Sequence, residues 1–224
     1  MRIHSIFESI SGEAGPVINQ GAWTTFIRTQ ECNCQCSYCD TKDALKPGGG
    51  MELSIAHIIN HVFTKNVLVT GGEPLIWEEM PQLLDLLAMR GHIVQVETNG
   101  TQWPLPRLGG VGYAVDIKCP CSGMQDSMPS PKDLRSTLIL EQHQTQPIDF
   151  KFVVKDMEDI AFASKYIAEI FPRAANSRFI FSPMNAETNP ELIQTIIKTM
   201  QQVDSAVMDR LIISLQLHKI LNLP

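Results

Sequence analysis

Short β-type runs that alternate with helical patterns constrain the fold of this chain more than any other feature. Strands separated by helical segments pair in parallel, because the helical crossover returns the chain to the same end of the sheet. The alternation therefore predicts an α/β fold with a parallel sheet. Its candidate strands are Thr24–Arg28, Val67–Thr70, Ile93–Glu97, Tyr113–Ile117, Phe150–Val154, Phe179–Ser182 and Leu211–Leu217.

Capping signals mark the ends of several helices between these strands. Ser54 is expected to be the N-cap of a helix with one apolar face, because a serine oxygen accepts hydrogen bonds from the first turn. A second helix is expected to end near Arg90, with Gly91 as its C-cap. Later helices are expected after Asp156 and Asn189.

The length of the chain and its loop-rich segments favour an incomplete barrel. A full (βα) barrel typically needs about 250 residues and eight strands, whereas this chain has 224 residues. Segments 100–112 and 119–132 are rich in Pro, Gly and Ser, so loops are expected to replace some helices there. Neither a repeat nor an interdomain linker is apparent in the sequence, and we predict one domain over residues 1–224.

The composition argues against several classes of function. The net charge of −6 does not suit a chain that binds a nucleic-acid backbone, which needs clustered Lys and Arg. The first residues contain no apolar run of signal-peptide length, and no apolar stretch approaches the roughly 20 residues of a membrane helix. We therefore expect a cytoplasmic enzyme for a small-molecule substrate, with no nucleic-acid or membrane partner.

Three cysteines, Cys32, Cys36 and Cys39, have the spacing Cys-x-x-x-Cys-x-x-Cys, which is one thiol short of a structural zinc or iron–sulfur site. Three thiolates can bind three irons of a 4Fe-4S cluster and leave the fourth iron open to a small molecule. Cys34 offers a fourth thiol for a zinc knot or a redox cluster, but the four thiols are too close in sequence to surround one ion without strain. We expect Cys34 to be a small buried side chain instead.

Three of the predicted strands run into polar turns, and ligands of parallel α/β folds bind beyond the carboxyl ends of the strands. Residues 71–74 read Gly-Gly-Glu-Pro, where the glycines let a ligand approach the backbone and the glutamate offers an acceptor to an ammonium group. Residues 97–100 read Glu-Thr-Asn-Gly, and residues 116–118 read Asp-Ile-Lys. We expect these turns at the same edge of the sheet.

The cysteine spacing, with Tyr38 just before the last thiol, resembles the radical S-adenosylmethionine superfamily. The Gly-Gly-Glu-Pro turn at the end of the next predicted strand adds to this resemblance. In that superfamily the turn holds the methionine amine of the cofactor, so the resemblance implies that Gly72 and Glu73 position S-adenosylmethionine. It also implies that the α/β fold is the incomplete parallel (βα) barrel of radical S-adenosylmethionine enzymes.

The flanking residues resemble one family within that superfamily, the 7-carboxy-7-deazaguanine synthases. Residues 6–13 read Ile-Phe-Glu-Ser-Ile-Ser-Gly-Glu, residues 26–28 read Phe-Ile-Arg, and Cys39 is followed by Asp-Thr. The resemblance implies a lyase that contracts the ring of 6-carboxy-5,6,7,8-tetrahydropterin to 7-carboxy-7-deazaguanine and releases ammonia, on the route to queuosine. The implied cofactors are a 4Fe-4S cluster, S-adenosylmethionine and Mg²⁺.

The resemblance also implies ligands, residue by residue. Thr41 would give an oxygen to Mg²⁺, which prefers hard oxygen ligands, although an N-cap role is the alternative. S-adenosylmethionine would be lined by Tyr38, Cys39, Asp40, Gly72, Glu73, Asp116, Ile117 and Lys118. The substrate would be bound by Ser11, Gly12, Glu13, Arg28, Thr70 and Pro224. In this set, Glu13 could accept from a guanine-like edge, and Arg28 could clamp a carboxylate through paired donors.

Several positions depart from the usual pattern of this family. Ser11 stands where the family usually has glutamine, Cys34 where it has leucine, and Tyr38 where it has tryptophan. The Asp-Ile-Lys of residues 116–118 stands where a Ser-Pro-Lys motif is usual. None of these changes removes a predicted cluster ligand, but the short side chain of Ser11 puts its contact with the substrate in doubt.

Two other functions are compatible with parts of this pattern. An activating enzyme that makes a radical on a partner protein would use the same cofactor, but residues 11–13 and 26–28 speak against it. A non-catalytic cluster or zinc module would use only the cysteines. For the enzyme, the resemblance further implies an electron donor such as flavodoxin or ferredoxin, and a homodimer.

Overall fold

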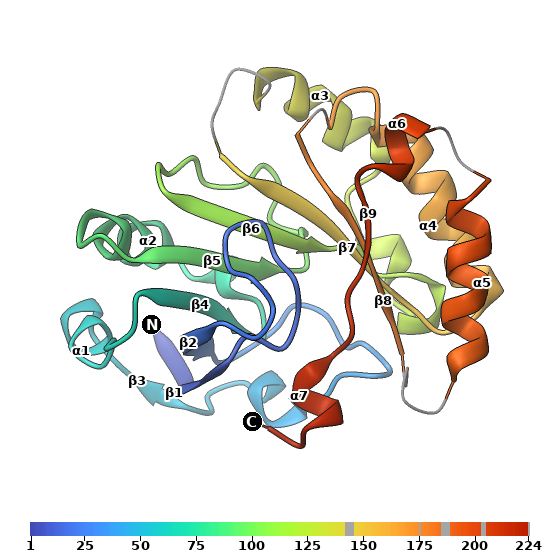
Figure 1. The fold of residues 1–224 in the computed structure, drawn as a ribbon. Helices are drawn as coiled ribbons and strands as arrows, with labels where there is room; N and C mark the ends of the chain where they lie inside the picture. The colour runs from blue at the N-terminus through green and yellow to red at the C-terminus, as the bar shows by residue number, and fades with distance from the viewer. Residues whose placement is uncertain (142–145, 175, 185–188, 203–204, 224) are drawn as a thin grey trace.

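The computed structural model describes residues 1–141, 146–174, 176–184, 189–202 and 205–223. Strands from these residues form one nine-stranded sheet (Figure 1). They are β1 (Arg2–Ile10), β2 (Trp23–Thr29), β3 (Met51–Glu52), β4 (Asn66–Gly71), β5 (Ile93–Thr98), β6 (Val111–Asp116), β7 (Ile148–Val154), β8 (Phe179–Pro183) and β9 (Leu211–Ile213). Their order across the sheet is β3-β1-β2-β4-β5-β6-β7-β8-β9.

Neighbouring strands from β2 onward in this order pair in parallel, as far as β9. The predicted parallel sheet and the existence of each candidate strand are therefore confirmed, and the open, mostly parallel sheet with helices is the expected incomplete α/β barrel. Two strands, β1 and β3, were not predicted. They lie at one edge of the sheet, where β1 pairs antiparallel with both β2 and β3. Most of β1 is only half-buried, so its sequence gives neither a continuous apolar run nor a clean alternation.

The last strand is shorter than predicted. The run Leu211–Leu217 was expected to be one strand, but β9 ends at Ile213. The hydroxyl of Ser214 accepts a hydrogen bond from the Ala14 N–H at 2.9 Å, and the Leu217 N–H donates to the Gly12 carbonyl at 2.9 Å. The chain leaves the sheet because it bonds to the β1–β2 loop, and it continues as the short helix α7 (Leu217–Ile220).

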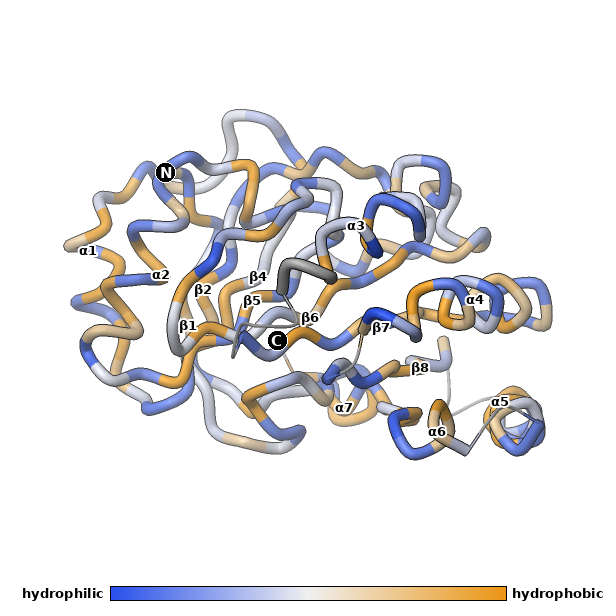
Figure 2. The backbone as a smooth tube through the Cα atoms, turned by 90° about the horizontal axis from the view of Figure 1, so that it is seen from above, coloured by the Kyte–Doolittle hydropathy of each residue, from blue (hydrophilic) through white to orange (hydrophobic). Residues whose placement is uncertain are grey.

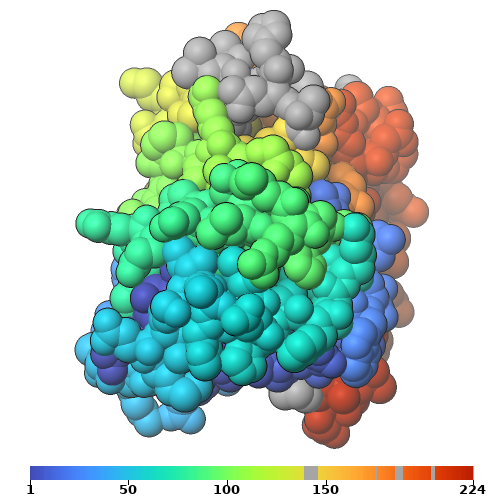
Figure 3. All heavy atoms as spheres, turned by 90° about the vertical axis from the view of Figure 1, so that its left-hand side faces the viewer, coloured from blue at the N-terminus to red at the C-terminus, as the bar shows by residue number. Residues whose placement is uncertain are grey.

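Helices cover the outer face of the sheet, as Figure 1 shows for α2 on one side and for α4 and α5 on the other. In the face shown in Figure 3, the segments that carry α1 and α2 form the cyan and green surface. The helices are α1 (Ile55–Ile59), α2 (Met80–Met89), α3 (Pro131–Glu141), α4 (Met157–Ile170), α5 (Pro190–Met200) and α6 (Ser205–Met208), with short 3-10 helices η1 (Lys42–Leu45), η2 (Pro74–Ile76), η3 (Pro120–Ser122) and η4 (Gln125–Ser127). Among the described helices, none is long and apolar enough to cross a membrane.

The predicted helix caps are confirmed. The Ser54 hydroxyl accepts a hydrogen bond from the His57 N–H at 3.2 Å, and the side chains of Asp156 and Asn189 cap α4 and α5 in the same way. Gly91 follows α2 with a φ of 84°, in the left-handed region that ends a helix readily. These caps fix where the crossovers begin and end, and hence where each strand starts.

The two predicted loops are only partly correct. Residues 99–110 contain no helix, as expected. The second segment, 119–132, holds turns and 3-10 helices, but α3 begins inside it at Pro131 and was not predicted. Proline suits the first position of a helix, and the Ser130 hydroxyl accepts from the Asp133 N–H at 3.2 Å. The prolines here therefore introduce a helix as well as a loop.

The strands place apolar and polar side chains on opposite faces of the sheet. On β7, Phe150 and Phe152 belong to the large apolar core under the helices, whereas Lys151 between them faces the inner side. The same alternation places Val115 outward and Asp116 inward on β6. Figure 2 shows the apolar stretches of these strands in orange. Because side chains alternate along a strand, the helices cover the apolar face and leave the inner face free for polar groups.

The β1–β2 loop, residues 11–22, crosses the inner face of the sheet. The Ile18 N–H donates to the Gln95 side-chain oxygen at 3.0 Å, and Ile18 packs with Phe26 and Leu68 in a second, smaller apolar cluster. The Arg178 guanidinium donates to the Gly15 carbonyl at 2.6 Å. In Figure 1 this blue loop passes in front of β5 and β6. The loop fills part of the barrel interior and brings its first residues beside the strand ends.

Candidate functional site

A single polar cavity lies at the carboxyl edge of the parallel strands. Its walls come from the strand ends, the cysteine loop that follows β2, the β1–β2 loop and α7. The lining residues are Gly12, Glu13, Phe26, Arg28, Cys32, Cys34, Cys36, Tyr38, Cys39, Asp40, Thr41, Leu45, Leu68, Thr70, Gly71, Gly72, Glu97, Thr98, Asn99, Asp116, Lys118, Lys151, Val153, Met184, Gln216, His218 and Lys219. Most of the predicted ligands, which come from distant parts of the sequence, thus meet in one place.

Five neighbouring strands contribute polar residues to the inner wall of this cavity, among them Arg28, Thr70, Glu97, Asp116 and Lys151. In the sheet register, Arg28 on β2 lies beside Thr70 on β4, and Asp116 on β6 lies beside Lys151 on β7. Three of these residues were predicted as ligands. Glu97 was noted only as part of a polar turn, and Lys151 was missed, although its place between two buried phenylalanines indicates an inward-facing polar residue.

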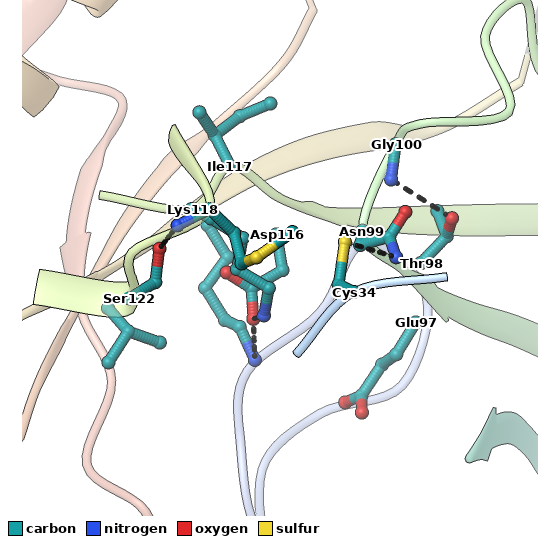
Figure 4. A network of polar contacts seen from close by, with 12 residues as sticks. Cys34, Glu97, Thr98, Asn99, Gly100, Asp116, Ile117, Lys118 and Ser122 are labelled. Atoms are coloured by element: carbon teal, nitrogen blue, oxygen red, sulfur yellow. Dashed lines mark hydrogen bonds and ion pairs between the residues drawn. The ribbon is translucent and has the colours of Figure 1, made fainter. Parts of the chain in front are cut away.

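The cysteine loop presents Cys32, Cys36 and Cys39 to the cavity. Cys34 is 2% exposed, as its prediction as a small buried side chain requires, and its sulfur accepts a hydrogen bond from the Asn99 amide at 3.3 Å (Figure 4). A hydrogen bond from the Cys34 thiol is the largest influence on Cys32 and helps lower the pKa of Cys32 to about 7. Cys32 therefore reaches the thiolate form, which binds metal, near neutral pH.

The donor set fits an open iron–sulfur cluster with a bound cofactor better than a single metal ion. In the part of the chain that the structure describes, no three His, Cys, Asp or Glu side chains converge on one ion. This spacing does not suit the zinc knot considered as an alternative, whereas a larger cluster can connect separated thiols. The Asp116 Oδ1 atom is also buried without a hydrogen-bond partner among the described residues, which leaves an acceptor for a cofactor hydroxyl.

The Gly-Gly-Glu-Pro turn forms the cavity wall through its backbone. A side chain at position 72 would lie 1.7 Å from the Glu31 carbonyl, so only glycine fits where this turn passes the cysteine loop. Glu73 itself is fully buried and does not line the cavity. Its carboxylate accepts hydrogen bonds from the Leu75 N–H at 3.0 Å, the Thr98 hydroxyl at 2.7 Å and the Asn99 N–H at 2.7 Å. Glu73 therefore joins two strand-end turns, and its predicted contact with the cofactor amine stays a prediction.

The Asp-Ile-Lys segment supplies two of its three residues to the cavity. The Lys118 ammonium lies 2.9 Å from Asp116 Oδ2 and 5.7 Å from the centre of the Tyr38 ring. Burial raises the pKa of Asp116, but the charges of Lys118 and Lys151 outweigh burial and hold it below its ordinary value. The Ile117 side chain is fully buried in the apolar core, so only its backbone is available to a ligand.

Helix α7 closes the cavity beside the cysteine loop. Asp40 Oδ2 lies 3.5 Å from the Lys219 ammonium and 3.8 Å from His218 Nε2. The polar contact with the His218 side chain is the main reason that the pKa of Asp40 is lowered. Thr41 precedes η1 but makes no capping hydrogen bond; its hydroxyl donates to Asp40 Oδ1 at 3.1 Å. The N-cap alternative for Thr41 therefore has no support in its side-chain contacts.

Comparisons with known proteins show which proteins this chain is similar to. The family model described as the radical SAM superfamily matches residues 26–108. A 7-carboxy-7-deazaguanine synthase of Methanospirillum hungatei is 32% identical, over 100% of this chain and 86% of the relative. Another, of Clostridium acetobutylicum, is 31% identical over 96% and 93% of the two chains.

The chain belongs to the 7-carboxy-7-deazaguanine synthase family. Among solved structures, QueE from Escherichia coli matches with a TM-score of 0.67 at 21% identity, over 96% of this chain and 93% of that one. That likeness supports the fold. The radical SAM match implies a 4Fe-4S cluster and S-adenosylmethionine as cofactors, and the resemblance stated from the sequence is confirmed.

The residues predicted to bind the substrate occupy different environments. Glu13 lines the cavity, and its carboxylate lies 2.6 Å from the Lys151 ammonium and 2.7 Å from the Gln216 amide nitrogen. Ser11 is fully buried outside the lining, and its hydroxyl donates to the Glu13 carbonyl at 3.0 Å. Ser11 thus shapes the loop and directs no side-chain atom at the cavity. Pro224 lies outside the described residues.

The three remaining predicted substrate residues, Gly12, Arg28 and Thr70, all line the cavity. The Arg28 guanidinium lies 5.2 Å from the centre of the Phe7 ring and has no hydrogen-bond or ion-pair partner among the residues that the structure describes. A lining guanidinium without a carboxylate partner can clamp an incoming one. The Thr70 hydroxyl donates to Glu97 Oε2 at 3.1 Å, and burial raises the pKa of Glu97 above its ordinary value.

We expect Glu73→Gln to destabilise the protein, although glutamine has nearly the same size and shape as glutamate. The amide nitrogen that replaces one carboxylate oxygen would face an N–H or O–H donor, at a cost of about 1–3 kcal/mol in the free energy of unfolding. Urea unfolding of the cluster-free protein measures this cost. Glu52→Gln, at an exposed position of β3, is the matched control and should have a negligible effect; equal stability of both variants would contradict the assignment.

Proposed function

We propose that this chain catalyses the radical-mediated contraction of 6-carboxy-5,6,7,8-tetrahydropterin to 7-carboxy-7-deazaguanine, with loss of ammonia, in queuosine biosynthesis. The observation that carries the proposal is one cavity in which the cysteine loop, with Cys32, Cys34, Cys36 and Cys39 in the lining, faces an inner wall of charged side chains. This arrangement suits a small, polar, carboxylate-bearing heterocycle. Membership of the 7-carboxy-7-deazaguanine synthase family supplies the reaction.

The thiols and the turn backbone are proposed to hold the cofactors. Cys32, Cys36 and Cys39 would bind three irons, and Gly72 would let the methionine part approach the turn. Asp116 would accept a hydrogen bond at its unpartnered oxygen, Oδ1. When bound, the cluster and S-adenosylmethionine supply the one-electron chemistry that removes a hydrogen atom from the substrate. The roles of Tyr38, Cys39, Asp40 and Lys118 beside the cofactor are supported by their places in the lining.

The remaining inner-wall residues are proposed to orient the substrate. Arg28 would bind the substrate carboxylate with paired donors, since its guanidinium has no carboxylate partner among the described residues. Glu13 would accept from the amino and ring N–H groups of the pterin, and Gly12 would allow the ring to lie close to the backbone. Thr70 would place a hydroxyl beside Glu97. Held this way, the substrate would be fixed against the cofactor, and the filled cavity would exclude water.

A magnesium ion is proposed at Thr41. Its hydroxyl lines the cavity and is not used as a helix cap, and Asp40 provides a neighbouring carboxylate. Mg²⁺ usually takes only one or two protein ligands and completes its shell with substrate oxygens and water. Thr41 would therefore help to hold the ion, which would offset negative charge on the bound substrate.

Four further features remain proposals. They are a single domain over residues 1–224, a cytoplasmic location, an electron donor such as flavodoxin or ferredoxin, and a homodimer. The contact of the Pro224 carboxylate with the substrate also remains one. Adding a glycine after Pro224 and measuring the Michaelis constant for the pterin tests that contact, which unaltered kinetics would exclude.

The decisive experiment is an anaerobic assay with reconstituted protein, dithionite, S-adenosylmethionine, Mg²⁺ and 6-carboxy-5,6,7,8-tetrahydropterin. Mass spectrometry should detect 7-carboxy-7-deazaguanine and stoichiometric ammonia. Cofactor cleavage without any conversion of the pterin would refute the proposed substrate and would direct attention to the activating-enzyme alternative.

We expect each single change of Cys32, Cys36 or Cys39 to Ala to abolish the iron-dependent chromophore and the activity. Cys34→Ala and Cys119→Ala should keep both, because these thiols are buried in hydrogen-bonded or apolar surroundings. Iron analysis and electron paramagnetic resonance spectra of the reconstituted variants make the comparison. Loss of iron from the Cys34→Ala variant would show that the ligand assignment is wrong.

We expect Thr41→Val to weaken the dependence of the activity on Mg²⁺ without loss of the cluster, because a hard cation and a thiolate-bound cluster use different ligands. Activity titrated against Mg²⁺ should show a higher half-saturation than in the wild type, with unchanged iron content. A half-saturation that stays the same would count against a magnesium site at this residue.

A further inference from the structure

Lys151 is a buried cation at the centre of the inner wall, and no predicted ligand set included it. Its residue is 7% exposed, and its ammonium lies 2.6 Å from Glu13 Oε2 and 3.4 Å from Asp116 Oδ2. Glu13 belongs to the β1–β2 loop on the proposed substrate side, whereas Asp116 ends β6 on the proposed cofactor side. One ammonium therefore connects the two halves of the cavity.

The contacts of Glu13 leave its carboxylate in one defined position. Lys151 donates to Oε2 at 2.6 Å, and Gln216 donates to Oε1 at 2.7 Å. A carboxylate can accept about four hydrogen bonds, two at each oxygen, so both oxygens can still accept from a ligand. This pair of free acceptor positions matches adjacent N–H donors, such as the amino and ring N–H groups of a 2-aminopyrimidinone.

The charged groups around Glu13 show how Lys151 affects the pKa of the Glu13 carboxyl. Glu13 faces Lys151 on β7, Asp116 on β6 and Glu97 on β5, with Lys118 beyond Asp116. Arg28 of β2, His218 and Lys219 of α7, and Asp40 of the cysteine loop line the same cavity. Burial raises the pKa of Glu13, but the charge and hydrogen bond of Lys151, with the hydrogen bond of Gln216, outweigh burial and lower it.

We propose that Lys151 is a positioning residue for substrate recognition, which fixes Glu13 as an oriented, ionised acceptor while Asp116 anchors the lysine from the cofactor side. The ligand recognised in this way is a planar heterocycle that presents two neighbouring N–H donors. The inference rests on the proposed function, because it names the residue through which the carboxypterin edge is read. Lys151 contributes by holding Glu13 and makes no contact with the reacting atoms.

The test compares the wild type with Lys151→Met, which keeps an unbranched side chain one atom shorter and removes the charge. The measurement is anaerobic calorimetric binding of 6-carboxy-5,6,7,8-tetrahydropterin to reconstituted protein with S-adenosylmethionine and without reductant, so that no turnover occurs. The dissociation constant at neutral pH should rise at least about tenfold, because one partner of a buried charged pair is lost. Lys155→Met, on an exposed lysine just after β7, is the matched control and should bind as the wild type does.

The dependence of binding on pH separates positioning from a merely structural role. In the wild type the lowered pKa keeps Glu13 ionised, so affinity holds through the mildly acidic range. Without Lys151, burial is opposed only by the hydrogen bond of Gln216, and the pKa of Glu13 rises. The affinity of Lys151→Met should therefore fall at mildly acidic pH and recover as the pH rises, whereas a structural defect would weaken binding equally at every pH.

Two more variants complete the test. In a Glu13→Gln background, Lys151→Met should change the dissociation constant less than about threefold, because a residue that acts through Glu13 has no separate effect once the carboxylate is gone. Lys151→Arg keeps a cation and should keep the wild-type pH dependence even if Lys151→Met does not fold.

A wild-type protein that does not bind the pterin defeats the proposed function itself. Pterin binding that is unchanged in Lys151→Met, or a Met-like pH dependence in Lys151→Arg, overturns only the role of the lysine.

Discussion

The pairing of buried charges on the inner face of the sheet is the constraint on which the rest of the site depends. Glu13 and Asp116 lie in surroundings where an unpaired carboxylate would lose its charge, and Lys118 and Lys151 are buried beside them. Charges removed from water are tolerated only when they are paired and hydrogen-bonded. Parallel strands meet this requirement because their register places Asp116 directly beside Lys151. The apolar face of the same strands packs under the helices, so one alternating pattern builds the core and the binding wall.

The same charges explain why the chain ends are folded over the open side of the barrel. The β1–β2 loop brings Glu13 to Lys151, and the segment after β9 brings Gln216 to Glu13 and α7 to Asp40. These two segments also bond to each other, through the Gly12 carbonyl and the Ser214 hydroxyl. A side chain at position 12 would lie 2.3 Å from the His218 ring, so glycine lets them approach closely. The loop after the first strand and the segment after the last strand are thereby joined, and both segments carry residues of the cavity lining.

The sequence predicts the fold better than it predicts the contacts of the site. Apolar runs identify the parallel strands because those strands are buried by helices, but β1 lies at the partly exposed edge and gives no such signal. Leu215 and Leu217 extend the apolar pattern of β9, although hydrogen bonds to the β1–β2 loop draw that segment out of the sheet. The rule that ligands follow the ends of parallel strands predicts Asp116. It does not predict Lys151, because this residue lies within its strand and points inward. Nor does the Gly-Gly-Glu-Pro motif reveal that its glutamate is sequestered beneath the cavity.

Asp116, which departs from the motif predicted at this position, takes part in the same pairing of charges. At the position where the resemblance predicts the serine of a Ser-Pro-Lys motif, this chain has a carboxylate. It pairs with two lysines through one oxygen and leaves the other, Oδ1, without a described partner. A serine hydroxyl would give Lys151 no second anion and would leave Glu13 as its only close counter-charge. With aspartate, Lys151 is held from both sides, and the negative charge added on the proposed cofactor side is offset by the ammonium groups of Lys118 and Lys151. The aspartate therefore affects how firmly Lys151 holds Glu13, and it also changes the groups offered on the proposed cofactor side. Recognition on the two sides of the cavity thus depends on one group, the ammonium of Lys151.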